Sequence, residues 1–180
     1  MLQYSVVALP KLDNQDQFQE LRERYDPLFY QIRPHIALVP PFTPATLGEL
    51  ESVGEYISQA RRHMHPVAIS FHEYLEEEDR ILCPVDKGKE ELQQLHRNLH
   101  GSEVLSLVDR EGYEPRLVVS RIPEPARRKL AIAEIRRLGR TLGIIDALSL
   151  IGIEQGGDLK LVASYPFGVG RVDYFDEFLA

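Results

Sequence analysis

The sequence predicts a single-domain α+β protein: two pseudo-symmetric lobes of antiparallel β-sheet with flanking helices around a central cleft. Three observations support this fold class. A chain of 180 residues with 43% hydrophobic content can bury one sizeable core. Short segments rich in β-forming residues alternate with segments of helical hydrophobic period. The same order of elements recurs in the two halves of the chain, which indicates two similar lobes.

The first half begins with a strand at residues 4–9, whose β-formers end at Pro10. Asp13 is placed to cap a helix with an apolar face formed by Phe18, Leu21, Tyr25 and Leu28. A second strand at 35–39 is expected to end at Pro40-Pro41. Thr43 and Pro44 then give the cap and first-turn pattern of a helix that reaches about residue 62 and buries Leu47, Leu50, Val53, Ile57 and Ala60.

A two-residue hydrophobic period at 67–72 predicts a strand, and an acidic turn at 73–79 is expected to connect it to a partner strand at 80–85 as a hairpin. The same turn is predicted to be a solvated hairpin tip rather than a metal site.

The second half continues with a helix marked by Leu92, Leu95 and Leu99, followed by a strand at 116–122 that stops at Pro123. A helix is expected between Pro125 and Gly143, with an apolar face of Leu130, Ile135, Leu138 and Leu142. The last hairpin pairs residues 144–154 with 159–165 across a Gln-Gly-Gly-Asp turn.

An internal repeat follows from this order. Segment 34–40 (PHIALVP) matches segment 115–123 (PRLVVSRIP), so that Arg116 corresponds to His35. We predict one bilobal domain over residues 1–180, with repeat halves at about 1–78 and 79–167 and a tail at 168–180. The two matched strands are expected to face each other across the cleft.

Charge is unevenly distributed along the chain. A formal net charge of −7 argues against a protein that coats nucleic acid through a general basic surface. Cationic residues nevertheless gather between positions 116 and 140, namely Arg116, Arg121, Arg127, Arg128, Lys129, Arg136, Arg137 and Arg140. This stretch is the predicted place for an anionic ligand.

The sequence offers little for other classes of site. No apolar run approaches the roughly 20 residues of a membrane span, and the first residues lack the pattern of a signal peptide, so we expect a cytoplasmic protein without membrane contact. The single cysteine, Cys83, is expected to be buried. The pairs His63/His65 and His96/His100 lack an evident third ligand, so neither a metal nor another cofactor is expected.

The segments 34–41, Tyr113-Glu114-Pro115 and Arg121 carry a resemblance to the 2H phosphoesterase superfamily (2′-5′ RNA ligase-like and cyclic phosphodiesterase families). That family is marked by two His-x-Thr/Ser-apolar motifs, one in each lobe. The resemblance implies that paired histidines act as acid and base on a 2′,3′-cyclic phosphodiester or a related bond. It also implies that the hydroxyl residues hold phosphate oxygens.

This sequence departs from the motif at Ala37, Arg116 and Val118, and only His35 is retained. His35 is therefore the predicted catalytic residue. Because a guanidinium stays protonated, Arg116 can bind phosphate but cannot relay a proton. Four residues are predicted to bind phosphate: Arg116, Ser120, Tyr113 and Arg121. Two alternatives remain open: Arg116 pairs with a carboxylate such as Glu154, or His35 packs within the protein and has no role in the cleft.

We therefore expect a divergent member that binds a phosphate-containing small molecule, such as a nucleotide or 2′,3′-cyclic phosphate, or an RNA end, between the lobes. Its phosphodiesterase activity would be weak or altered. An active enzyme that pairs His35 with a different group is a less favoured version. The alternative is a catalytically inactive interaction protein on the same fold. The sequence does not define the oligomeric state.

Overall fold

The computed structural model describes residues 2–108 and 112–175 and contains helices on both sides of antiparallel sheets. The strands are β1 (Gln3–Ala8), β2 (Lys11–Leu12), β3 (His35–Phe42), β4 (Val67–Phe71), β5 (Leu75–Glu77), β6 (Arg80–Pro84), β7 (Arg116–Arg121), β8 (Thr141–Ile145), β9 (Ala147–Ile153), β10 (Leu159–Pro166) and β11 (Asp173–Tyr174). The α-helices are α1 (Gln15–Tyr25), α2 (Leu47–Ala60), α3 (Lys89–Leu99), α4 (Glu103–Ser106) and α5 (Pro125–Ile135). Two 3-10 turns, Arg61–His63 and Arg136–Leu138, extend α2 and α5. This arrangement confirms the α+β class.

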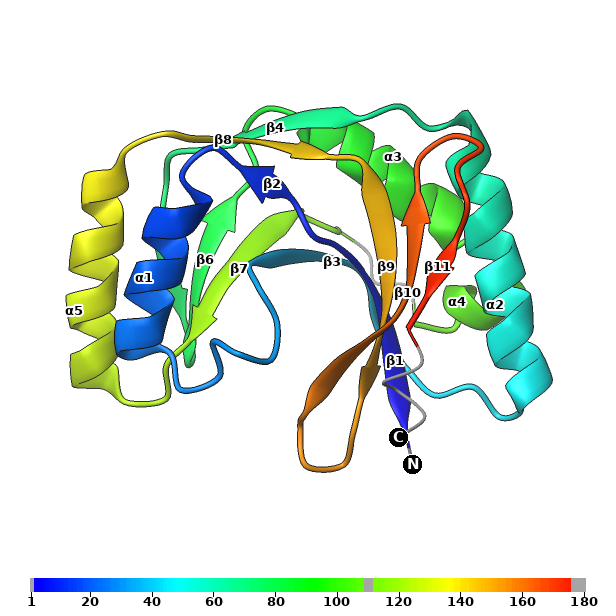
Figure 1. Ribbon diagram of the computed structural model, residues 1–180, viewed down its shortest axis with the longest axis horizontal. Helices are drawn as coiled ribbons and strands as arrows, with labels where there is room; N and C mark the ends of the chain where they lie inside the picture. The colour runs from blue at the N-terminus through cyan, green and yellow to red at the C-terminus, as the bar shows by residue number, and fades with distance from the viewer. Residues whose placement is uncertain (1, 109–111, 176–180) are drawn as a thin grey trace.

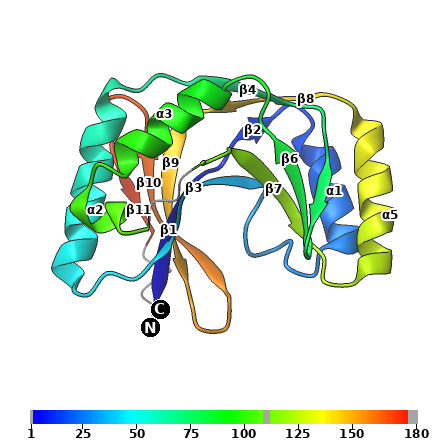
Figure 2. The ribbon, with the colours of Figure 1, turned by 180° about the vertical axis from the view of Figure 1, so that it is seen from behind.

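Most strands belong to one sheet in the order β11-β10-β9-β1-β3-β7-β6-β5, and a smaller sheet has the order β2-β8-β4. In Figure 1 the large sheet curves through the centre of the molecule, while β4 and β8 run across the top. Helices α1 and α5 cover the left end and α2, α3 and α4 the right end, an arrangement that Figure 2 shows from behind.

The two ends of the molecule each combine segments from both halves of the chain. Helix α1 packs on α5, and α2 packs on α3. The elements β1-α1-β3-α2-β4 follow the same order as β6-α3-β7-α5-β8, so that β1 corresponds to β6 and β3 to β7. In the large sheet the four strands stand in the order β1-β3-β7-β6, which is symmetric about the pair β3 and β7 under this match. The lobes are thus not the sequence halves themselves. The internal repeat stays a prediction.

Strands β3 and β7 form the seam at the middle of the large sheet. Their antiparallel register pairs His35 with Val118 and Ile36 with Leu117. The matched strands are therefore hydrogen-bonded neighbours, and the expectation that they face each other across a cleft was wrong. Because side chains alternate along a strand, Ile36 and Leu117 enter the core while His35 and Val118 point to the opposite face.

Four predicted elements have different limits, beginning with β3 and α1. Strand β3 continues through Pro40 and Pro41, because the register with β1 shifts between the Val39 and Phe42 pairs and this irregularity accommodates residues without an N–H group. Helix α1 follows Asn14, while the Asp13 carboxylate accepts a hydrogen bond from the Leu142 amide instead.

Helix α2 begins later than the Thr43-Pro44 pattern predicted. Its N-cap is Thr46, whose hydroxyl accepts from the Glu49 amide at 3.2 Å, and the Glu49 carboxylate accepts from the Ala45 amide at 2.7 Å. This reciprocal arrangement is close to a capping box, a stronger start signal than Thr43. Leu47 consequently lies outside the buried face and is exposed.

The helix predicted between Pro125 and Gly143 ends at Ile135, and its 3-10 extension stops before Gly139, which has a φ of +69°. Residues 141–145 alternate between buried and exposed positions as strand β8. Leu130 and Leu142, which the helical pattern placed in the core, are 61% and 51% exposed. The buried face of α5 is instead formed by Arg128, Ala131, Ile132 and Ile135.

The predicted hairpin between residues 67–72 and 80–85 is also corrected. Strand β4 pairs with β8 in the small sheet, and β6 pairs with β5 and β7 in the large one. The acidic turn does form a hairpin tip, but it joins β5 to β6. The final hairpin is confirmed for β9 and β10, but its first strand starts at Ala147, because residues 144 and 145 belong to β8 and pair with β4 in the small sheet.

Within the described residues, no helix is both long and apolar enough to cross a membrane.

Cys83 lies in β6 and is fully buried, as the sequence predicted. Burial, with a smaller contribution from Asp86, raises the pKa of its thiol far above the ordinary value. Since the thiolate is the reactive form, the native protein is expected to react with a disulfide reagent such as DTNB about 10²-fold or more slowly than the urea-unfolded chain. Equal rates, with free glutathione as the reference thiol, would contradict this buried placement.

Candidate functional site

A cavity of about 380 Å³ opens where β1, β3 and β7 meet the segment that follows α1 and the β9–β10 hairpin. We call it the His35 cavity. Its lining includes His35, Ala37, Val118, Ser120 and Arg121 from the two motif strands. Antiparallel pairing at the seam brings these strands together, so the residues that the sequence matched at separate places do share one site.

His35 contributes the one imidazole of this lining. Its Nδ1 lies 3.2 Å from the Arg33 carbonyl oxygen, a geometry in which Nδ1–H donates and Nε2 is the unprotonated nitrogen. Burial lowers the pKa of His35 to about 4, with a further lowering by the charge of Arg22; the Arg33 carbonyl acts in the opposite direction. At neutral pH the imidazole is uncharged and can accept a proton.

The remaining motif positions give the cavity an apolar strip. Ala37 and Val118 both line it, on the strands that carry His35 and Arg116. Neither side chain has a hydrogen-bonding group. Anion-binding donors must therefore come from elsewhere in the lining.

Ser120 is such a donor and was predicted from strand alternation. It is 2% exposed, and its Oγ has no hydrogen-bond partner among the described residues. Leaving a buried hydroxyl unpaired costs on the order of 1–3 kcal/mol. The group is available to a ligand within the cavity.

Arg22 was missed by the sequence analysis. It projects from α1, is 3% exposed, and its Nη1 has no partner in the part of the chain that the structure describes. Its Nε donates to Asp26 Oδ2 at 3.3 Å, and its Nη2 to the Ile32 carbonyl. Burial lowers the pKa of the guanidinium, whereas Asp26 acts to raise it.

The signal for Arg22 was present in the helical pattern. Phe18, Leu21, Arg22 and Tyr25 occupy one helical stripe, so a charged residue stands on the core-facing side of α1 with Asp26 four residues later. A buried cation with a partner at this spacing indicates a special role more often than a solvated arginine does.

Three more arginines reach the lining: Arg33, Arg80 and Arg121. Arg121 Nε donates to Asp79 at 2.6 Å, and Arg80 pairs with Glu77 and Glu78. No ion pair of the Arg33 side chain is found among residues 2–108 and 112–175. The lining holds four guanidinium groups and one carboxylate, that of Asp26, but Arg22, Arg80 and Arg121 are each ion-paired. Arg33 is the lining arginine without an ion pair among the described residues, and it gives the His35 cavity its cationic excess in a chain of net charge −7.

Arg116 and Tyr113 do not line this cavity. Arg116 Nη1 donates to Glu77 Oε2 at 2.6 Å, and its side chain is 41% exposed. Arg116 thus pairs with a carboxylate, as one alternative held, although the partner is Glu77; Glu154 pairs with Lys160. The Tyr113 ring stacks on His96 at 3.9 Å, and its hydroxyl donates to the Ala37 carbonyl.

Three arginines of the predicted anion stretch pair with the predicted acidic turn. Arg128 pairs with Glu76, Arg116 with Glu77 and Arg121 with Asp79. Sequence charge alone could not show this, because the pairing depends on β5 and β6 lying beside β7 and α5. Among the described arginines that line the His35 cavity, Arg22 and Arg33 are the two without a partner in this acidic turn.

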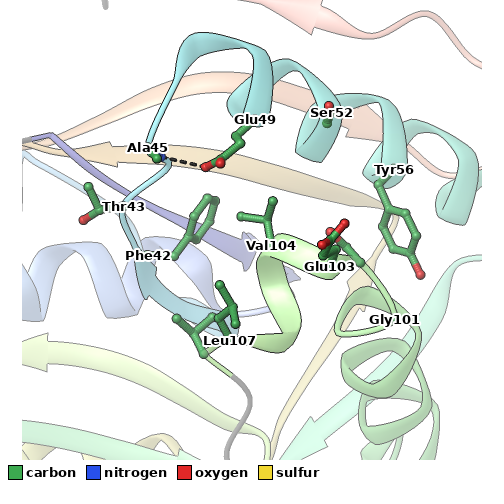
Figure 3. Close-up of a pocket in the computed structure, with 12 residues that line it drawn as sticks. Phe42, Thr43, Ala45, Glu49, Ser52, Tyr56, Gly101, Glu103, Val104 and Leu107 are labelled. Atoms are coloured by element: carbon green, nitrogen blue, oxygen red, sulfur yellow. Dashed lines mark hydrogen bonds between the residues drawn. The ribbon is translucent and has the colours of Figure 1, made fainter.

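A second, larger cavity of about 650 Å³ lies between α2, α4 and the end of β3. Figure 3 shows Glu49 and Glu103 among its side chains, with the Glu49 carboxylate hydrogen-bonded to Ala45. Its lining has no arginine, lysine or histidine. This lining disfavours an anion, so the larger cavity is not the better candidate for a phosphate site.

Within the described parts of the chain, no group of three or more His, Cys, Asp or Glu side chains is arranged to hold a metal ion. His96 and His100 are buried, with ring centroids 4.1 Å apart, and His96 Nδ1 bonds the Leu38 carbonyl. These histidines pack α3 against β3.

Similarity to known proteins agrees with this geometry. The sequence pattern of the 2′-5′ RNA ligase superfamily matches residues 10–157. A Bacillus licheniformis protein named as a candidate phosphoesterase is 26% identical over 121 residues, which cover 66% of this chain and 70% of that protein.

Solved structures share the fold at low identity. A crystal structure of a phosphoesterase matches with a TM-score of 0.60 and 9% identity, over 93% of this chain and 99% of that one. E. coli LigT with phosphate gives 0.57 and 9%, over 92% and 97% of the two chains. Kluyveromyces marxianus Usb1 gives 0.55 and 11%, over 92% and 98%. The family pattern covers most of the sequence, and the chain therefore belongs to the 2′-5′ RNA ligase superfamily of 2H phosphoesterases.

Proposed function

We propose that this protein binds a phosphate ester in the His35 cavity and acts on it as a weak or chemically altered phosphodiesterase. The ligand class is a nucleotide, a 2′,3′-cyclic phosphate or an RNA end. The observation that carries the proposal is that His35, at the family motif position, opens into a cavity whose charged lining is four arginines and one carboxylate. A phosphate anion is favoured there, and Asp26 is the one carboxylate of the described lining that competes with it.

Relatives give independent support for the ligand class. LigT has been solved with phosphate and with 3′-AMP, and Usb1 with uridine monophosphate. These ligands share a phosphate group. The cationic lining of the His35 cavity is the feature of this chain that such a group would contact.

The altered chemistry follows from the residues at the motif positions. His35 can act as a general base, whereas Arg116 occupies the place of the second histidine and is held by Glu77. A general acid or base contributes about 10²–10⁴-fold in rate. With one proton-transfer group the chain should favour substrates whose leaving group departs without protonation, or turn over slowly.

Calorimetric titration with 2′,3′-cyclic AMP, with hydrolysis followed in parallel, tests the proposal. We expect saturable binding that inorganic phosphate competes away. Arg33→Ala should weaken it about 10-fold, because a hydrogen bond to a charged group contributes about 1.5 kcal/mol at the low end of its range, which fits an exposed side chain. Arg136→Ala, which removes an exposed arginine outside the cavity lining, is the matched control and should bind as the unmodified protein does.

Arg116→Ala tests whether phosphate binds at Arg116, as the sequence predicted, or at the arginines that line the His35 cavity. Since Arg116 lies outside the lining and pairs with Glu77, its removal should change affinity less than Arg33→Ala does. The absence of both binding and turnover in the unmodified protein would instead favour the inactive interaction protein.

A further inference from the structure

We propose that Arg22 and Ser120 form a preformed phosphate-binding pair in the His35 cavity and replace the hydroxyl groups absent at Ala37 and Val118. The inference deepens the proposed function and rests on it. It assigns phosphate contact to a helix residue that lies outside both motif segments.

The Arg22 guanidinium is fixed on two sides by the protein. Its Nε bonds the Asp26 carboxylate and its Nη2 bonds the Ile32 carbonyl, both within the segment that connects α1 to β3. Nη1 is left without a partner among the described residues, although the side chain is buried. A guanidinium held in this way is oriented before a ligand arrives, so little side-chain freedom is lost on binding.

Asp26 connects this guanidinium to the strand that carries Ser120. Asp26 Oδ2 accepts from Arg22 Nε and from the backbone amide of Arg121, each at 3.3 Å. The Asp26 Oδ1 accepts from the Leu28 amide at 2.9 Å. One carboxylate therefore ties α1 to β7 directly beside Ser120, and both unpartnered groups line the same cavity.

A phosphate bound against both residues would supply the acceptors that these two donors lack. Buried polar groups are hydrogen-bonded in the great majority of cases, so two buried groups without partners in one cavity point to a ligand that supplies the acceptors. The N–H groups of Arg22 Nη1 and the hydroxyl of Ser120 can each donate to a phosphate oxygen. His35 lines the same cavity with its Nε2 free to accept a proton from the reacting hydroxyl or water.

Ser120→Ala is the cleanest test, because the hydroxyl has no bond within the described structure to lose. The variant should unfold at the same temperature as the unmodified protein or a higher one, yet bind inorganic phosphate and 2′,3′-cyclic AMP about 5–10-fold more weakly. Opposite signs for stability and affinity would distinguish a ligand contact from a packing role.

Arg22 needs a variant that does not leave Asp26 charged and buried alone. In the double variant Arg22→Gln/Asp26→Asn both charges are removed, and we expect binding of the same two probes to weaken about 10–100-fold, the range for hydrogen bonds to charged groups. Arg24→Gln, two residues along α1 and paired with exposed Glu134 outside the lining, is the matched control and should leave binding unchanged.

The outcomes separate the two proposals. If the unmodified protein binds both probes and Ser120→Ala and the double variant bind equally well, the phosphate-binding pair is wrong while the proposed function stands. If the unmodified protein binds neither probe, the proposed function fails and the pair fails with it. Should the double variant not fold, as judged by circular dichroism, Ser120→Ala decides by itself.

Discussion

Replacing His35 with asparagine is expected to lower kcat/KM for hydrolysis of 2′,3′-cyclic AMP by about 10²–10⁴-fold, the contribution of one general base. Asparagine can still donate a hydrogen bond to the Arg33 carbonyl in place of Nδ1, so the strand position is preserved while the proton acceptor is lost. The affinity for inorganic phosphate should change little, because the cationic groups remain.

The pH profile of hydrolysis by the unmodified protein tests which protonation state of His35 is active. Burial and the Arg22 charge hold the pKa of His35 near 4, and the base must be neutral to act. Activity should therefore rise with pH through about 4 and stay level through neutrality, without the second limb that a paired histidine acid would add. A midpoint near the ordinary 6.5 would contradict the buried placement of His35.

Ile36→Ala is expected to lower the free energy of unfolding by about 2–5 kcal/mol, the usual cost of truncating a fully buried isoleucine. Ile36 has no exposed surface and pairs with Leu117, which is equally buried, at the seam of the large sheet. Only the pairs at 35/118 and 36/117 form this register, so little else compensates for the lost packing. Urea denaturation followed by circular dichroism measures the change.

Leu130→Ala is the control for this measurement. The helical pattern placed Leu130 in the core, whereas the structure leaves it 61% exposed on α5. An exposed substitution of this kind changes stability by about 0.5 kcal/mol or less. A loss as large as that of Ile36→Ala would show that the sequence-based core assignment was the better one.

Elements with a regular hydrophobic period were predictable from the sequence. The β-forming residues of β1, β7 and β10, with the proline or turn residues beside them, and the leucine spacing of α3 predicted strands and a helix near their observed limits. Residues 141–145 were misassigned because Leu138 and Leu142 continue a helical spacing, and only pairing with β4 and β2 makes this segment a strand.

The candidate site was predictable in part for a similar reason. Strand alternation placed His35 and Ser120 correctly in relation to one cavity, because side-chain direction along a strand is a local property, whereas Arg121 was predicted from the family resemblance. The partners of charged side chains are not local. Glu77 on β5 bonds Arg116 because the order of strands in the large sheet brings β5 near β7. Arg116, which the sequence match placed opposite His35, therefore lies outside the cavity lining.

The sequence by itself determined the fold class and the family, and it predicted that His35 retains the motif while Arg116 replaces its second histidine, since these depend on residue type and spacing. Only the tertiary structure decided which arginines remain for an anion. Ion pairs form between opposite charges that folding brings within a few ångströms of each other, and burial raises the free-energy cost of leaving a charged group unpaired. Arg116 and Arg121 form ion pairs with the acidic β5–β6 hairpin. Arg22 is buried with Asp26 and lines the cavity, and its Nη1 has no hydrogen-bond partner among the described residues.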